Sequence, residues 1–194
     1  NDHEHLGVLG TGQLELGDHT LESTLVFERD AGGAPGPSEF QQRYEQARVD
    51  SDRTIATLGM QRRDVASGGW GMLDLKLGAG YVHRGLDYRN DEPFLVGEPV
   101  SSVSTHDAAT VTAGLSGYFD VGNITHLTVE GRTAHYDAES NFESTTTLAA
   151  DRQTLGVGLS NELLLFDQSV SLIAGLRTEF VDGRRGLSVP VMPA

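Results

Sequence analysis

The sequence lacks cysteine, contains no long apolar run and carries far fewer cations than anions. Without cysteine, neither a disulfide framework nor a thiolate metal site can form. No apolar run approaches the roughly 18 residues that identify a membrane-spanning helix. The chain has 14 Lys and Arg residues against 28 Asp and Glu residues, which gives a formal net charge of −14. Because nucleic acids are bound through cationic side chains, this charge argues against a nucleic-acid partner.

Two further absences concern the ends of the chain and its chemistry. The chain begins at Asn1 without a visible signal peptide, and residues 189–194 do not have the pattern of a strand. We therefore expect the sequence to be an internal section of a longer protein. The Gly-x-Ser-x-Gly and His-Glu-x-x-His motifs are absent, and no glycine-rich stretch completes a dinucleotide-binding fingerprint. These absences predict that the protein is not an enzyme.

The clearest feature that is present is an alternating pattern over residues 154–180. Leu155 and Leu159 share one face of its first arm, Leu172 and Leu176 share one face of its second arm, and small or polar residues fill the other face. A period of two predicts β-strands with one apolar face. Each arm exceeds ten residues, whereas an average strand has about 5–6 and a tilted membrane strand needs about 9–11. We therefore predict a hairpin of a transmembrane β-barrel.

The same pattern recurs along the chain, with short turns near residues 17, 67, 121 and 167. Long polar connections alternate with these turns, as in outer-membrane barrels with short periplasmic turns and longer external loops. The fold class that we predict is all-β, an antiparallel up-and-down transmembrane β-barrel. Residues 1–194 would form part of one barrel domain, an incomplete section of a larger barrel, although eight strands could also close alone. The expected strands cover residues 5–16, 19–29, 53–65, 70–88, 108–119, 124–138, 154–165 and 169–180; the long connections cover residues 30–52, 89–107 and 139–149, with a short helix over residues 38–49.

Three passages carry a resemblance to a known family. Leu25-Val-Phe-Glu-Arg-Asp-Ala-Gly-Gly-Ala-Pro-Gly-Pro37 runs from a strand into a loop rich in Gly and Pro. Leu115-Ser-Gly-Tyr-Phe-Asp120 has Thr128-Val-Glu-Gly-Arg-Thr-Ala-His-Tyr136 as its hairpin partner, and residues 155–177 form the hairpin described above. With these passages, about residues 5–182 resemble the barrel of TonB-dependent outer-membrane receptors, the group that includes cobalamin and ferric-siderophore transporters.

The resemblance implies a role for the parent protein in the outer membrane of a Gram-negative bacterium. That role would be TonB-dependent uptake of a scarce nutrient such as cobalamin or a ferric siderophore. Its partners would be outer-membrane lipid, the plug domain of the same chain, TonB and the small-molecule nutrient. No residue of this sequence matches the plug or the segment that contacts TonB. Because a complete receptor barrel has about 22 strands, this section alone could not carry out uptake.

Candidate site residues fall into two groups. Acidic residues in the long connections are weak candidates for loop-bound Ca²⁺, because oxygen-rich loops can hold this ion and external loops of cobalamin receptors do so. Solvated loop acids are the alternative, and no other cofactor is predicted. The paired His3 and His5 fit a solvated chain end better than a metal site. The calcium candidates are Asp50, Asp52, Asp91 and Glu92, and the polar wall expected to face the lumen is Glu22, Lys76, Glu130, Arg132, Glu162, Arg177 and Glu179.

Three other interpretations stay open. A self-contained small outer-membrane barrel would have a structural or adhesive role and no part in transport. An outer-membrane barrel enzyme would need a Ser–His pair near one rim, for which the sequence has no motif. A soluble β-sandwich adhesin would fold without detergent, because its apolar faces would pack against each other.

Overall fold

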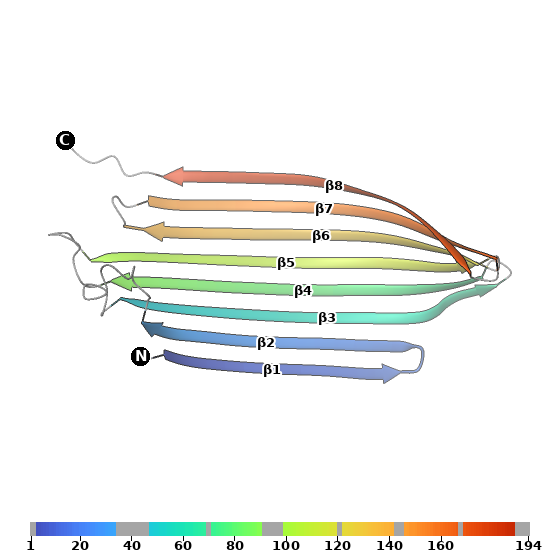
Figure 1. Ribbon diagram of the computed structural model, residues 1–194, viewed down its shortest axis with the longest axis horizontal. Helices are drawn as coiled ribbons and strands as arrows, with labels where there is room; N and C mark the ends of the chain where they lie inside the picture. Colours follow the sequence, from blue (N-terminus) through green and yellow to red (C-terminus); the bar gives the residue numbers. More distant parts are fainter. Residues whose placement is uncertain are drawn as a thin grey trace.

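The structure is a computed structural model that describes residues 3–33, 47–68, 71–90, 99–119, 122–141, 146–166 and 169–188. These residues form one sheet of eight strands, in which each strand pairs antiparallel with the next strand along the chain (Figure 1). The strands are β1 (His3–Leu16), β2 (His19–Gly33), β3 (Arg48–Gly68), β4 (Gly71–Asn90), β5 (Val100–Phe119), β6 (Asn123–Ser140), β7 (Thr146–Leu165) and β8 (Val170–Ser188).

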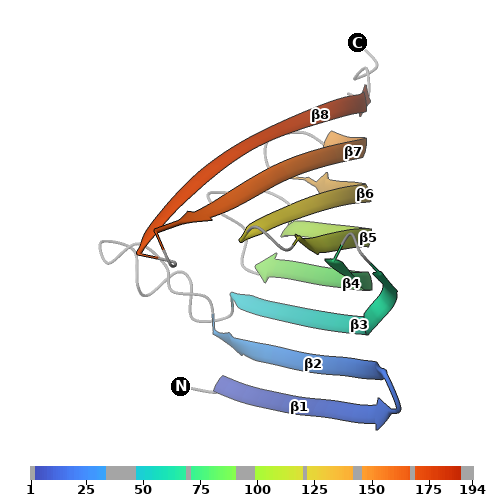
Figure 2. The ribbon, with the colours of Figure 1, turned by 90° about the vertical axis from the view of Figure 1, so that its right-hand side faces the viewer.

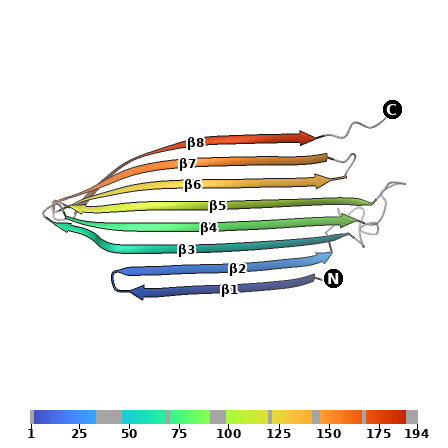
Figure 3. The same ribbon diagram turned by 180° about the vertical axis from the view of Figure 1, so that it is seen from behind.

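The arrangement confirms the predicted all-β class with eight antiparallel up-and-down strands. The sheet is not closed, because β1 and β8 do not pair, and they lie at opposite edges of a curved wall (Figure 2). Seen from behind, β1 begins and β8 ends at the same end of the sheet (Figure 3). We call this the loop end, and the opposite end, where β1 turns into β2, the turn end.

Most strands extend further toward the loop end than the sequence predicted. β3 begins at Arg48 instead of near residue 53, β5 at Val100 instead of 108, and β7 at Thr146 instead of 154. The backbone hydrogen bonds between strands continue beyond the alternating apolar residues, because backbone groups pair whatever side chains they carry. Asp50, for example, lies opposite Asp87. The predicted connections were therefore too long. Residues 48–49 of the predicted helix belong to β3, and residues 38–46 lie outside the described residues.

The register gives the sheet two chemically different faces, because residues opposite each other on neighbouring strands share a face. On the apolar face, Leu77 lies opposite Met60 on one side and Ala113 on the other. On the polar face, the adjacent Gly78 lies opposite Gly59 and Thr112. At this level of the sheet, apolar and polar side chains thus lie on opposite faces.

The sheet is a single layer whose apolar side chains are exposed. Leu58, Val111 and Leu159 are 58%, 64% and 51% exposed, and among the described hydrophobic residues only Ala47 and Ala108 are buried. On β5 the exposed Val111 alternates with half-buried neighbours on the polar face, which indicates that the polar face is the concave one. No second protein layer covers the described part of the apolar face, so its cover must come from elsewhere.

Local irregularities lie at the turn end. A β-bulge between Arg62 and Ala66 shifts the register against β4, and Asp64 adopts a positive φ of 56° there. Its backbone N–H donates to the Asp74 carboxylate at 3.1 Å. Gly71 has a φ of 113°, and a Cβ at this position would overlap the carbonyl of Tyr118. These features bend the strand ends beside the short connection.

Candidate functional site

A band of apolar residues on the apolar face stops well short of the loop end, and we call it the apolar belt. It spans residues 73–81 of β4 and 155–165 of β7, whereas both strands are 20 residues long. A belt of this height matches the roughly 9–11 residues that cross a bilayer. Among its polar exceptions is Asn161, which donates through its side-chain amide to the Thr125 hydroxyl at 2.8 Å. The belt covers residues 6–16, 21–27, 56–60, 73–81, 109–119, 127–131, 155–165 and 170–180.

The upper edge of the belt, toward the loop end, falls steadily from β1 to β8. On β1 it ends at Leu6, which the register places in the same cross-strand row as Gly85. On β8 it ends at Phe180, which lies in the row of Ala79. The upper edge thus falls by six residues over seven strand spacings, which corresponds to a strand tilt of about 30° relative to the belt. Closed barrels have tilts of about 35–45°, so the stagger of this open sheet is slightly smaller than that of a closed barrel.

Directly above the belt, a hydrogen-bonded cluster joins three strands. The Tyr81 hydroxyl donates to Asp107 at 2.5 Å, and the same carboxylate oxygen lies 2.8 Å from His83 Nδ1. The other ring nitrogen, His83 Nε2, lies 3.2 Å from the Asp52 carboxylate. An imidazole between two carboxylates satisfies both contacts only as the doubly protonated cation. Opposite Asp52, Gly85 leaves the space that this carboxylate occupies, since a Cβ at Gly85 would overlap it.

The cluster continues along one register row. His83 lies opposite Asp107, Asp107 opposite His135, and His135 opposite Asp151. We call these four residues the charged row. His135 Nδ1 is 2.7 Å from the Asp151 carboxylate. Imidazole and carboxylate side chains therefore alternate across β4, β5, β6 and β7, beyond the upper edge of the belt.

The hydrogen bonds of the charged row shift the pKa values of its members. The hydrogen bond that His83 donates to Asp107 raises the pKa of His83, and the charges of Asp107 and Asp52 add to this rise, although burial opposes it. The hydrogen bonds from Tyr81 and His83 lower the pKa of Asp107. The hydrogen bond to Asp151 raises the pKa of His135. All three shifts favour the charged forms.

The charged row was not predicted from the sequence. Its signal was partly visible, since Asp107 and His135 are equally far from the turn near residue 121 and their pairing follows from that turn. His83 and Asp107 are separated by a long connection, across which local sequence sets no register. The paired His3 and His5 were expected at a solvated chain end. Both are exposed, but they belong to β1, where His5 Nδ1 is 2.6 Å from the Asp30 carboxylate.

The predicted lumen-facing residues lie on one face of the sheet. The register places Glu22, Glu130 and Glu179 in a single row across the polar face. Arg177 Nη2 lies 3.5 Å from Glu130 and 2.8 Å from Glu179. Ser171 donates to Glu162 at 2.6 Å. Lys76 and Arg132 also belong to this face, and no ion pair links either one to a described residue.

The placement of two calcium candidates in a loop was wrong. Asp50 and Asp52 lie on β3, on the apolar face beyond the belt, and Asp52 contacts His83. The ladder extends past the point at which polar side chains suggested a loop. Asp91 and Glu92 lie outside the described residues. Among the residues with described positions, no group of three or more His, Asp or Glu side chains is arranged to hold a metal ion.

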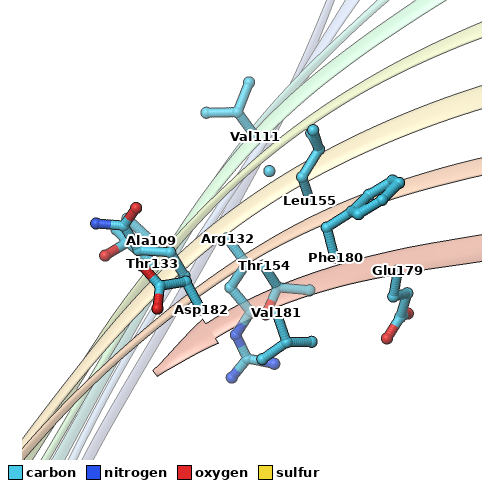
Figure 4. A pocket seen from close by; sticks show the side chains of 12 residues that line it. Ala109, Val111, Arg132, Thr133, Thr154, Leu155, Glu179, Phe180, Val181 and Asp182 are labelled. Carbon is cyan, nitrogen blue, oxygen red and sulfur yellow. The ribbon is translucent and has the colours of Figure 1, made fainter. Parts of the chain in front are cut away.

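A groove of about 810 Å³ lies over β5–β8 at the upper edge of the belt (Figure 4). Gly131 forms its floor, and a Cβ at this glycine would meet no atom within 4 Å. Val111, Leu155 and Phe180 line it on the apolar face. The next row toward the loop end supplies Thr133, Gln153 and Asp182.

Comparisons with known proteins give the chain no family. No protein-family model matches it, and no curated protein sequence matches it significantly. In the part of the chain that the structure describes, no helix is long and apolar enough to span a membrane.

Proposed function

We propose that the chain forms part of the wall of an outer-membrane β-barrel in a Gram-negative bacterium. The apolar belt would face lipid, and the polar face would line the lumen. The observation that carries the proposal is the exposed belt, which is 9–11 residues high on β4 and β7 and staggered along the sheet. A soluble sandwich would need a second layer over this face, and the described residues supply none.

The free edges of the sheet add a physical reason for closure. Lipid cannot satisfy the unpaired N–H and C=O groups along β1 and β8, so a membrane wall must close on itself or on further strands. Small residues on the concave face, among them Gly78, Gly80 and Thr112, allow the sheet to curve in that direction.

For the parent protein, we propose a receptor for TonB-dependent uptake of a scarce nutrient such as cobalamin or a ferric siderophore. The resemblance of residues 25–37, 115–120, 128–136 and 155–177 supports this proposal. The row of Glu22, Glu130 and Glu179, with Arg177 between two of them, would give a plug domain a charged surface to contact. Deleting the gene in its host should abolish growth when only that nutrient form is supplied. Unchanged growth on cobalamin and on each siderophore tested would contradict the receptor role but not the barrel.

Membrane insertion tests the wall itself. The chain, diluted from urea into phospholipid vesicles or non-ionic detergent, should gain β-sheet circular dichroism. Its residues at the loop end should stay accessible to protease while the belt is protected. The proposal would be contradicted if the chain did not float with the vesicles in a density gradient and folded in plain buffer instead.

The stagger also favours a second candidate, a self-contained barrel with a structural or adhesive role. The same stagger carried one strand further would bring Gly10 of β1 opposite Ala174 of β8. Because the sequence has no cysteine, the double variant Gly10→Cys, Ala174→Cys is free of background thiols. In detergent it should form an intramolecular disulfide only if the eight strands close. The double variant Gly10→Cys, Leu176→Cys tests the neighbouring register in the same way. If neither double variant forms the disulfide, the result supports the larger barrel.

A further inference from the structure

Two arginines lie directly opposite each other on the polar, concave face of the sheet, toward the loop end. Arg53 of β3 is paired in register with Arg84 of β4, and His106 of β5 lies on the other side of Arg84. Residues opposite each other on antiparallel strands have Cβ atoms about 4.5–5.5 Å apart, and like charges at this distance repel. The sheet therefore holds two positive charges side by side. We call Arg53 and Arg84 the arginine pair.

The described residues compensate these charges only in part. Arg53 Nη1 lies 3.6 Å from the Glu28 carboxylate, which is longer than a hydrogen bond, and the buried Nε of Arg53 has no hydrogen-bond partner among the described residues. No ion pair or hydrogen bond links Arg84 to another described residue. Each guanidinium group carries five N–H donors. Because Arg53 is 43% exposed and Arg84 is exposed, a ligand on the concave face can reach the unused donors.

The neighbouring rows on the concave face of β3, β4 and β5 offer the arginine pair no carboxylate. One row supplies aliphatic side chains on the side of the turn end, and the other supplies two serine hydroxyls and a leucine. These residues are Ile55, Val82 and Ala108, followed by Ser51, Leu86 and Ser104. Asp52 and Asp107 are close in sequence, but they lie on the apolar face and contact His83. An acceptor for the arginine pair must therefore come from outside these strands.

We propose that the arginine pair binds a small-molecule anion that carries carboxylate or phosphate groups. Planar guanidinium groups bind these oxyanions through two parallel N–H···O hydrogen bonds. An oxyanion between Arg53 and Arg84 would offset their mutual repulsion and accept hydrogen bonds from the unused donors. The inference rests on the proposed function, in which the polar face lines the lumen, and it makes the nutrient of the proposed receptor an anion.

The position of the arginine pair along the lumen favours a diffusing ligand over the plug domain. The row of the pair contains Glu28, six residues further along β2 toward the loop end than Glu22. The row of Glu22 is the one proposed above to contact the plug. In the proposed barrel the loop end is the external side, so a ligand that enters from outside reaches the arginine pair before it reaches that row.

Nuclear magnetic resonance of the chain in non-ionic detergent, with nitrogen-15 at arginine Nε, tests the proposal. The probes are succinate, which carries two carboxylates, its uncharged dimethyl ester, and inorganic phosphate. Succinate or phosphate should shift the Nε–H resonances of Arg53 and Arg84 to saturation, whereas the ester should leave them unchanged. Saturation by either anion supports the site. Saturation by neither anion, or an equal response to succinate and its ester, would overturn it.

Two variants separate the arginine pair from the general effect of charge. Arg84→Gln should weaken anion binding about tenfold, the scale of one hydrogen bond to a charged group. Arg132→Gln is the matched control, because it removes the same charge from the same face but Arg132 lies opposite Thr110 and Thr154. This control should bind the anion as the parent chain does. Equal weakening in both variants would show that only net charge matters and would contradict the site.

Urea unfolding without added anion distinguishes ligand binding from a structural role. Arg84→Gln removes the repulsion between like charges, so its unfolding midpoint should not fall below that of Arg132→Gln. A lower midpoint would show that the arginine pair stabilises the sheet and would count against the proposal. A chain that folds and inserts into vesicles but binds neither anion contradicts only this site, whereas a chain that folds in no detergent contradicts the proposed wall.

Discussion

His83 joins three strands because each of its ring nitrogens faces a carboxylate from a different neighbour. Asp107 lies on β5 and Asp52 on β3, while His83 itself lies on β4. Side-chain exposures of 29% for His83 and 37% for Asp107 leave these contacts partly screened by solvent, so each contributes modestly. Because both contacts require the cation, the strength of the cluster depends on pH.

We predict that the loop end of β3–β5 is most stable in mildly acidic solution. The raised pKa of His83 means that its contribution is fully present below about pH 6.5, the ordinary histidine value, and is lost as the pH rises through the higher folded-state pKa. The lowered pKa of Asp107 means that its contribution is lost only in strong acid, as the pH falls through that value. Hydrogen exchange at residues 82–88 and 102–108, corrected for the intrinsic rate, should show protection decreasing above neutrality.

The variant His83→Gln should remove this pH dependence. A matched control is His106→Gln, which changes the same side chain on the other face of β5. Protection that falls with pH equally in both variants would contradict the role assigned to His83.

A second residue-level prediction concerns Gly85. Gly85→Ala should displace the Asp52 carboxylate from His83, because the new Cβ would overlap it. We expect a loss of about 1 kcal/mol in the free energy of unfolding, the usual scale for one charged contact and local strain. Urea unfolding from detergent measures it. Gly10→Ala carries the same change in chain entropy with open space around the Cβ and should cost nothing, so equal effects would refute the argument.

At the scale of the strand, the important feature is the mismatch between strand length and belt height. β4 continues from the end of the belt at Tyr81 to Asn90 without losing its pairing to β5. The part beyond the belt carries His83 and Asp87, which suit water or lipid head groups but not hydrocarbon. The same strand would therefore cross lipid over one half and project from it over the other.

We predict a position-dependent cost for arginine on the apolar face. Leu77→Arg lies at the centre of the belt on β4 and should cost about 2–4 kcal/mol in refolding into vesicles. Val103→Arg lies on the same face of β5, opposite Asp87 and beyond the belt, and should cost about 0–1 kcal/mol. Denaturant titration in lipid vesicles measures both. Equal costs would show that the belt does not lie in hydrocarbon.

At the scale of the whole molecule, the sheet has no core and two unpaired edges. β1 is exposed along its whole length, and the described sheet buries almost no hydrophobic side chain. A single layer of this kind cannot offset the conformational entropy lost on folding in water. Lipid on one face and further strand pairing at both edges would supply the missing stabilisation.

We therefore predict that the chain associates in plain buffer, both through its edges and through its apolar face. Sedimentation velocity should show large, polydisperse species that disappear in non-ionic detergent. Replacing Val8 and Leu14 by Lys should reduce this association, because both side chains lie on the exposed apolar face of the edge strand β1. A monodisperse, folded chain in buffer alone would contradict the account of the molecule as a membrane wall.

The sequence by itself determined which segments are strands, which face each side chain takes and how the chain turns between strands. Period-two alternation fixes these properties locally, as at Leu155, Leu159 and Leu176, and short turns fix the register of the strands that they join. Only the tertiary structure decided how far each strand continues beyond its apolar residues and which residues meet across the long connections. His83 reaches Asp107 and Asp52, and Gly131 opens a groove beside Phe180, because strand offset is set by pairing along the whole ladder. Alternation predicts the face of the sheet on which a side chain lies, but not which residue it meets on the neighbouring strand. These contacts therefore follow from the strand register and not from the sequence pattern.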